Sequence, residues 1–326
     1  MISAVTGANG FIGSNLVRGL LRERQQVRAL VRTGRDLGAL DGLKCEVIQL
    51  DYSDASSLRS VLTGVEVLFH LAARTRDYGT RREFQKINLG LTQAIAHAAV
   101  NAGVRRFVFT SSAVLYGCGA RCNLRECDVS LHLKFPYART KLQAEQYLLG
   151  LSGIEVVITR PGDVFGPGDR LVTWPFLDAI RRGRLAYVNS GQALLCYTYI
   201  DNLVQGLILA AGRGRTREIY NLTDGTRISL RTLAEKTAQA LGVPAPKYSV
   251  PFCLAYPAAA LLERLYLILD LDDPPLTRYR VLRACNDCHL SIEKAQQELG
   301  YRPETDLEKQ IAAMVGWYLK ETARQA

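Results

Sequence analysis

The segment Thr6-Gly7-Ala8-Asn9-Gly10-Phe11-Ile12-Gly13 constrains the fold of this chain more than any other. It follows a short apolar run at 2–5 and opens a run in which Ile12, Leu16 and Leu20 recur every four residues. A strand, a glycine loop and an amphipathic helix in that order form a phosphate-binding unit, because the helix N-terminus offers free N–H groups to an anion. We therefore expect a dinucleotide to contact Gly7, Asn9, Gly10, Phe11, Ile12 and Gly13.

Short β-branched runs alternate with segments of helical period over the first 160 residues. This alternation predicts an α/β fold, a Rossmann doubly wound parallel sheet with helices on both faces. The expected strands are 2–5, 26–31, 45–50, 66–71, 105–110 and 155–159.

The alternation loosens after residue 160, where prolines and glycines mark a long loop. We expect a nucleotide-binding domain over 1–170 and a smaller C-terminal α+β domain, mainly for substrate, over 171–326. The segment 197–223 again reads strand, helix, strand, with Asp201 as the predicted helix cap. It is therefore predicted to rejoin the sheet domain.

The net charge and the cysteine content limit the classes of partner, compartment and metal site that fit this chain. The chain has 41 lysine and arginine residues against 31 aspartate and glutamate residues, a balance that attracts anions. Scattered arginines and the lack of an RNA-binding aromatic signature predict no nucleic-acid partner. The N-terminal segment lacks signal-peptide features, so a cytoplasmic protein with reduced thiols is expected. A single Cys285-x-x-Cys288 pair falls short of the four ligands zinc prefers, so no metal site is predicted.

The end of the second expected strand bears on cofactor choice, because an acidic residue there bonds the adenosine ribose of NAD. This strand ends at Arg32, and the next carboxylate is Asp36. A guanidinium at this place can pair with the 2′-phosphate of NADP. The pattern favours NADP(H), with NAD(H) as the alternative. Asp51 and Tyr52, just past the third strand, are predicted to contact the adenine edge.

A Tyr137-x-x-x-Lys141 motif points to acid–base chemistry, because residues four apart share one helix face. A nearby ammonium lowers a phenol pKa, so we expect a lowered pKa for Tyr137. Ser112, at the end of the fifth strand, is predicted to hydrogen-bond the reacting oxygen, with Ser111 as the alternate. Carboxyl ends of parallel strands are where such sheets hold their active sites.

Together these motifs resemble the extended short-chain dehydrogenases/reductases. The matches are 6–13, Asp51, His70-Leu71-Ala72-Ala73, Asn88, 110–117, Tyr137 with Lys141, and Arg160-Pro161. The resemblance implies a Ser-Tyr-Lys triad with Asn88 as an auxiliary residue, and a homodimer. It also implies cofactor contacts from Leu71, Ala72, Ala73, Thr110, Tyr137, Lys141 and Pro161.

Three further segments, 160–169, 199–202 and 274–277, resemble the 3β-hydroxysteroid dehydrogenase, sterol-4-carboxylate dehydrogenase and 2-alkyl-3-oxoalkanoate reductase branch. This branch implies interconversion of a hydroxyl and a ketone on a small hydrophobic substrate. Nucleotide-sugar epimerase or dehydratase activity is the alternative, although Gly162-Asp163 stands where those enzymes keep an asparagine for the diphosphate. A non-catalytic NADP-binding regulator is the second alternative.

The segment 252–271 is the most apolar part of the chain, interrupted by Glu263, Arg264 and Asp270. Each such charge costs about 2.5–3.5 kcal/mol at the centre of a membrane-spanning helix, which argues against a span. We expect an apolar lid over the substrate that contacts a membrane peripherally.

Overall fold

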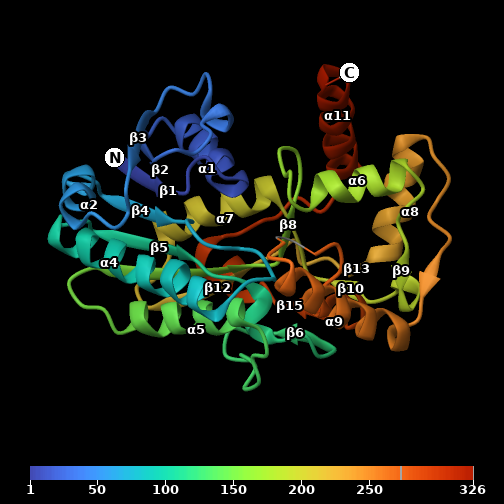
Figure 1. Ribbon diagram of the computed structural model, residues 1–326. Coiled ribbons are helices and arrows are strands. Elements are labelled where there is room, and N and C mark those ends of the chain that lie inside the picture. Colours follow the sequence, from blue (N-terminus) through green and yellow to red (C-terminus); the bar gives the residue numbers. More distant parts are fainter. Residues whose placement is uncertain (272–273, 326) are drawn as a thin grey trace.

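The computed structural model describes residues 1–271 and 274–325 and contains a seven-stranded parallel sheet (Figure 1). The strand order is β12-β7-β5-β4-β1-β2-β3, and every neighbouring pair is parallel. This arrangement confirms the predicted doubly wound sheet. The strands are β1 (Ile2–Thr6), β2 (Gln26–Arg32), β3 (Glu46–Leu50), β4 (Val67–His70), β5 (Arg106–Thr110), β7 (Glu155–Pro161) and β12 (Glu218–Leu222).

Alternate side chains of six of the seven strands enter two separate cores, one on each face of the sheet, while the edge strand β3 contributes to one core only. In β1, Val5 packs with helices α1 (Phe11–Arg22) and α7 (Ile200–Arg213), whereas Ala4 enters the opposite core. That opposite core contains residues of α2 (Ala55–Leu62), α4 (Leu91–Asn101) and α5 (Pro136–Leu149). Figure 1 shows α4 and α5 below the sheet and α1 and α7 above it, so helices cover both faces as predicted.

The remaining elements lie mostly in the C-terminal half, to the right in Figure 1. Their helices are α6 (Thr173–Arg181), α8 (Leu230–Leu241), α9 (Phe252–Ile268), α10 (Arg278–Cys285) and α11 (Leu307–Gln325), while α3 (Arg81–Phe84) precedes a π-helical turn at Gln85–Gly90. Four two-stranded sheets pair β8 (Asp163–Phe165) with β11 (Tyr197–Tyr199), β9 (Tyr187–Val188) with β14 (Ser249–Val250), β10 (Leu194–Leu195) with β13 (Ile228–Ser229), and β6 (Arg121–Leu124) with β15 (Cys288–Leu290).

The segment 197–223 divides between two sheets. β12 extends the central sheet beside β7, but β11 pairs with β8 in a separate two-stranded sheet. Helix α7 begins at Ile200 with Tyr199 at the N-cap position, so the predicted cap Asp201 lies instead in the first turn. A carboxylate there still interacts favourably with the positive end of the helix dipole. The division of the chain into two domains at residue 170 stays a prediction.

Candidate active site

The glycine loop between β1 and α1 is shaped by backbone contacts that leave no room for side chains. Gly10 N donates to Gly7 O at 3.0 Å, and α1 begins at the next residue. A Cβ on Gly13 would lie 2.2 Å from Gly7 O, far inside van der Waals contact. Gly7 itself has φ +67°, which side-chain-bearing residues rarely adopt. The loop therefore holds the free N–H groups of Phe11, Ile12 and Gly13 open to an anion.

Tyr52 lies under this loop rather than at an open adenine edge, which corrects the prediction. Only 7% of the residue is exposed, and its hydroxyl donates to Leu30 O at 2.8 Å. The same oxygen accepts the Gly7 N–H at 3.4 Å. The hydroxyl thus joins the glycine loop to strand β2. The neighbouring Asp51 remains exposed, and its carboxylate accepts the Ser53 N–H at 2.9 Å.

Two polar residues frame the space beyond the end of β2. Asn9 donates from its side-chain amide to Asp36 O at 2.9 Å, which ties the glycine loop to the loop after β2. The Asp36 carboxylate accepts the Gly38 N–H at 2.9 Å. Arg32 is exposed, and its guanidinium forms no hydrogen bond or ion pair with any described residue. A cation rather than an anion therefore stands at this strand end.

His70 at the end of β4 connects the glycine loop to the helices behind the sheet. The Thr92 hydroxyl donates to Asn88 O at 2.7 Å, so it accepts from His70 Nε2 at 2.9 Å. His70 Nδ1 then accepts from the Thr6 hydroxyl at 2.8 Å. Burial, with the Lys141 charge, lowers the pKa of His70 to about 3, so the imidazole is neutral.

The Thr6 hydroxyl also fixes the strand end that was predicted to face the cofactor. It accepts the N–H groups of Leu71 and Ala72 at 3.1 and 3.2 Å. The Ala72 backbone lies 3.1 Å from where a Cβ of Gly7 would be, so Leu71 and Ala72 adjoin the glycine loop. The contact predicted for Ala73, the next residue, stays a prediction.

The structure brings Ser112, Tyr137 and Lys141 together at the carboxyl end of β5. The Ser112 hydroxyl lies close enough to the Tyr137 phenol to lower the pKa of that phenol, and it accepts the Val114 N–H at 3.3 Å. Lys141 Nζ donates to Thr110 O at 2.8 Å. The triad is therefore assembled from a strand end and one turn of α5.

The charge states of the triad differ from the prediction. Burial raises the pKa of Tyr137 to about 12, and the hydrogen bond with Ser112 lowers it only in part. Burial also lowers the pKa of Lys141 to about 8, against the raising effect of the Glu145 carboxylate. The expected lowering of the phenol pKa is therefore wrong in this structure, because burial of the phenol dominates and Lys141 is not among the groups that shift its pKa.

Two buried hydroxyls beside the triad have no partner among the described residues: Thr110 Oγ1 and Ser111 Oγ. Unpaired buried polar groups are costly, so a ligand with polar groups fits here. Pro161 is buried at the end of the adjacent strand β7. These hydroxyls and the glycine cradle fit NAD(P): the N–H groups at the start of α1 would hold its pyrophosphate, and Thr110 and Ser111 would offer hydroxyls to its polar groups.

Asn88 joins the loop after β4 to helix α5 through its side-chain amide. Its side-chain oxygen accepts the Arg74 N–H at 2.8 Å, and its amide donates to Arg74 O at 3.2 Å. The amide also donates to Thr140 Oγ1 at 3.3 Å. Asn88 lies in the π-helical turn, so this local irregularity ties the loop after β4 to helix α5.

A buried ion pair that sequence reasoning missed anchors the catalytic helix. Arg160 in β7 donates to both Glu145 carboxylate oxygens at 2.9 and 2.6 Å, and the two side chains are 2% and 1% exposed. Arg160 also donates to the Tyr116 hydroxyl at 3.0 Å. That hydroxyl donates to Asn221 Oδ1 in β12 at 2.6 Å. The network joins α5, the segment after Ser112 and the sheet edge.

A second missed group comes from α10. Arg283 donates to the Asp163 carboxylate at 2.8 Å, although only 11% of the Arg283 side chain is exposed. Tyr279 packs edge-on against Phe135, the N-cap residue of α5, at 5.3 Å between ring centroids. These pairs join residues more than 100 positions apart, and no local spacing signals them.

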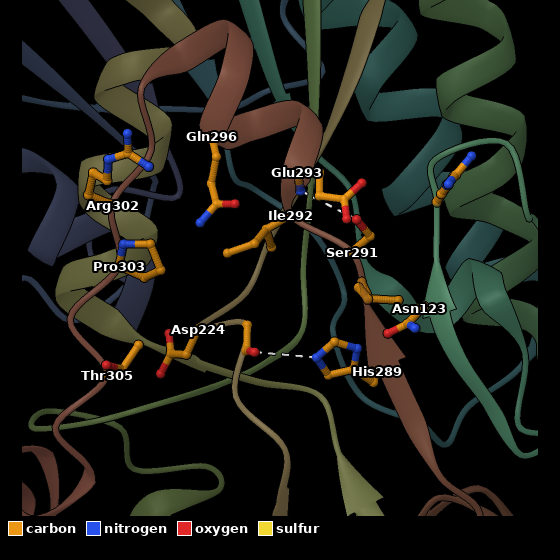
Figure 2. A pocket seen from close by; sticks show the side chains of 13 residues that line it. Asn123, Asp224, His289, Ser291, Ile292, Glu293, Gln296, Arg302, Pro303 and Thr305 are labelled. Atoms are coloured by element: carbon orange, nitrogen blue, oxygen red, sulfur yellow. Dashed lines mark hydrogen bonds between the residues drawn. The ribbon is translucent and has the colours of Figure 1, made fainter.

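An apolar cavity of about 250 Å³ borders the helix that carries Tyr137. Its lining residues are Val114, Leu133, Phe135, Ala138 and Leu282, together with Gly117, Cys118, Gly119, Ser130, His132 and Lys134, and none of the triad residues is among them. A larger cavity of about 490 Å³ lies between the loop after β12, strand β15 and the segment 302–305 (Figure 2). None of the predicted site residues lines that larger cavity.

Comparisons with known proteins agree with this geometry. Residues 3–223 match the sequence signature of the NAD dependent epimerase/dehydratase family. The chain is 33% identical to a 4-hydroxy-2-methyl-3-oxo-4-farnesyl-3,4-dihydroquinoline-1-oxide ketoreductase of Stigmatella aurantiaca over 92% of each chain. It is 30% identical to a 2-alkyl-3-oxoalkanoate reductase of Stenotrophomonas maltophilia over 94% of this chain and 96% of that one. The solved structure of MoeE5 in complex with UDP-glucose and NAD superposes with a TM-score of 0.79 at 26% identity, covering 99% of this chain and 100% of MoeE5.

Proposed function

Because the chain belongs to the NAD dependent epimerase/dehydratase family and is an NAD(P)-dependent oxidoreductase of the extended short-chain type, we propose that it reduces a ketone on a hydrophobic substrate with NADPH. The observation that carries the proposal is the Ser112, Tyr137 and Lys141 constellation at the carboxyl end of β5.

The protonation states of these residues suit the reductive direction. With its pKa raised to about 12, the Tyr137 phenol is protonated at neutral pH and can donate its proton to a developing alkoxide. The Ser112 hydroxyl, beside the phenol, can donate a second hydrogen bond to the same oxygen. Lys141, with a pKa near 8, is mainly an ammonium at neutral pH and favours negative charge nearby. NAD(P)H supplies the hydride when bound.

Arg32 supports the choice of NADP(H) over NAD(H). Its guanidinium is exposed at the end of β2 and is unpaired within the described residues. The nearest acidic residue in sequence, Asp36, uses its carboxylate on the Gly38 N–H. An unpaired guanidinium suits a 2′-phosphate, which it can bind with two parallel hydrogen bonds.

The substrate class rests on the cavity and on the relatives. Five of the eleven residues that line the space beside α5 are aliphatic or aromatic, and Ser130, His132 and Lys134 add polar groups, so the space suits an apolar chain that carries a polar group. Both relatives are named for reduction of a keto group in a molecule with an alkyl or farnesyl chain. A 3-oxo acid with a long alkyl chain is the substrate class that we propose.

A second candidate function is nucleotide-sugar epimerisation, favoured by the likeness to MoeE5 with UDP-glucose. Asp163 disfavours it, because a carboxylate repels a diphosphate. Its Arg283 partner offsets that charge only in part, since Asp163 remains half-exposed.

The test is NADPH oxidation measured with a panel of 2-alkyl-3-oxo acids, steroid ketones and UDP-sugars, with Tyr137→Phe as the inactive control. We expect turnover of the keto acids that increases with chain length. Interconversion of UDP-glucose without net NADPH loss would establish the epimerase instead. Tight NADPH binding with no turnover across the panel would favour a non-catalytic regulator.

A further inference from the structure

Exposed large apolar side chains concentrate in one short segment of the molecule. Of the sixteen on the described surface, ten lie within 248–271. They are Tyr248, Val250, Phe252, Leu254, Leu261, Leu265, Leu267, Ile268, Leu269 and Leu271, hereafter the α9 patch. Single exposed apolar residues are ordinary, but ten within one segment of 24 residues point to an interaction site.

The apolar face of α9 points away from the protein. Leu254, Leu261, Leu265 and Ile268 recur at helical spacing and are 45–71% exposed. The opposite side carries the only two buried residues of the helix, Ala255 and Ala259, which pack against Val281 of α10. Figure 1 shows α9 at the lower right, on the opposite side of the molecule from α2. The helix is thus attached through small residues and presents its large ones outward.

Helix α9 contains two charged residues, Glu263 and Arg264, and only Glu263 is in an ion pair with another described residue. The Glu263 carboxylate accepts from Arg278 N and Nε at 2.6 and 2.7 Å, and its side chain is 13% exposed. Arg264 is exposed and has no hydrogen bond or ion pair with any described residue. Lys247 is also exposed, next to Tyr248, while Asp270 follows the helix. An apolar face with an unpaired arginine at its flank fits an anionic lipid surface.

We propose that the α9 patch docks the protein onto the surface of an anionic membrane, with α9 parallel to the bilayer. The helix has 17 residues, about 25 Å of length, and no helix in the described parts of the chain combines the length and apolar character needed to cross a membrane. Phe252 and Tyr256, stacked at 5.3 Å near the start of α9, provide the aromatic pair typical of the headgroup region.

A second copy of the chain fits this patch less well. Twofold dimers bring the same residues of both chains together. The α9 patch of such a dimer would hold two Arg264 side chains in an apolar interface, in a chain of net charge +10. Bilayer docking instead places Arg264 among anionic headgroups.

Docking here would place the membrane close to the active site. The Tyr78 hydroxyl donates to Glu263 O at 3.2 Å, so α9 is attached to the loop that follows Leu71. Tyr279 of the adjoining α10 packs on Phe135 at the start of α5. The docking itself is independent of the proposed function, whereas delivery of a membrane-dissolved ketone rests on it.

The test is co-sedimentation of the full chain with vesicles of phosphatidylcholine alone or mixed with phosphatidylglycerol. The chain should bind the anionic vesicles more tightly, and salt should weaken the binding. The double variant L261S/I268S should lose affinity by roughly 50-fold, because two aliphatic side chains no longer leave water. Arg264→Gln should lose roughly fivefold at low salt.

The control is Leu319→Ser in α11, whose leucine is 47% exposed and lies outside the α9 patch, whereas Leu261 and Ile268 are 70% and 71% exposed. It should bind vesicles like the unmodified chain. Absence of vesicle binding, or equal losses for L319S and L261S/I268S, would overturn the proposal. So would a dimer in solution that L261S/I268S dissociates, since a second copy would then cover the patch. Vesicle binding without ketone reduction would leave docking intact and refute the proposed function alone.

Discussion

Strand β5 and helix α9 are both rich in apolar residues, yet they use them in opposite ways. All five residues of β5 are buried, because helices cover both faces of the central sheet. In α9, only two of 17 residues are buried. The comparison shows that apolar composition alone does not define a core. What decides is whether the topology brings a partner to each face.

The candidate active site and the exposed apolar surface also lie on different parts of the chain. The cofactor cradle and the Ser112, Tyr137 and Lys141 constellation sit on sheet elements whose cores are closed. The C-terminal elements contribute the apolar surface and the cavity wall residue Leu282. The candidate catalytic residues therefore lie on the central sheet and its helices, whereas most of the exposed large apolar side chains lie in the C-terminal elements. Five changes test this division, in order of decreasing effect.

Tyr137→Phe should lower turnover by about 10²- to 10⁴-fold, since a proton donor is removed. NADPH affinity should stay nearly unchanged, because the glycine loop and Arg32 do not contact this hydroxyl. Steady-state rates and a fluorescence titration of NADPH measure the two effects. Unchanged turnover on a verified substrate would show that Tyr137 is not the proton donor.

Arg160→Met should destabilise the fold by about 3–5 kcal/mol, because it leaves Glu145 buried without its partner. The matched control is Arg182→Met, which breaks an exposed pair with Asp178 and should cost less than about 1 kcal/mol. Denaturant unfolding compares the two midpoints. Equal losses would show that the buried network does not anchor α5.

The Arg160 network also shows where prediction from sequence ends. The glycine loop and the Tyr137–Lys141 pair were predictable, because strand–loop–helix order and four-residue spacing are local properties. Arg160 was noted only as part of a motif, since its partner Glu145 lies on another element. The strand β12 was predicted by its pattern, but the pairing of β11 with β8 depends on tertiary packing.

Dependence on tertiary packing also explains why the predicted position of Tyr52 and the predicted pKa of Tyr137 differ from the structure. Tyr52 follows the third strand as predicted, but its burial under Gly7 depends on how β1, β2 and β3 pack. The pKa of Tyr137 rises because neighbours from several elements exclude water around it. The four-residue spacing predicts that Lys141 lies on the same helix face, but it does not predict the desolvation that raises the pKa of Tyr137.

Arg32→Ala should weaken NADPH binding by about 1.5–3 kcal/mol, the cost of losing a charge-assisted hydrogen bond to phosphate. NADH, which lacks the 2′-phosphate, should bind as before. The two dissociation constants, measured for both proteins, separate the interpretations. Equal losses for both cofactors would mean that Arg32 contacts the adenine and does not select NADP(H).

Ketone reduction should decline above pH 8, by about tenfold per pH unit, if the Lys141 ammonium is required. The sign follows from its pKa, which burial lowers to about 8: the charged form prevails below that pH and is lost above it. Initial rates across pH 6.5–9.5, about three units around that value, provide the profile. NADPH affinity over the same range is the control, and a flat rate profile would show that the lysine charge is dispensable.

Leu254→Ala should change folding stability least, by no more than about 0.5 kcal/mol, because exposed substitutions leave no cavity. Leu254 is 63% exposed on α9, whereas Leu203 on α7 is fully buried. The same substitution at Leu203 should cost about 2–5 kcal/mol, through lost burial and a residual cavity. Both leucines are helical, so helix propensity cancels in the comparison. Unfolding curves for the two variants therefore measure how differently the two halves use apolar side chains. If Leu254→Ala destabilised the chain as much as Leu203→Ala, the outer side of α9 would belong to the folded core and would not be free to meet a membrane.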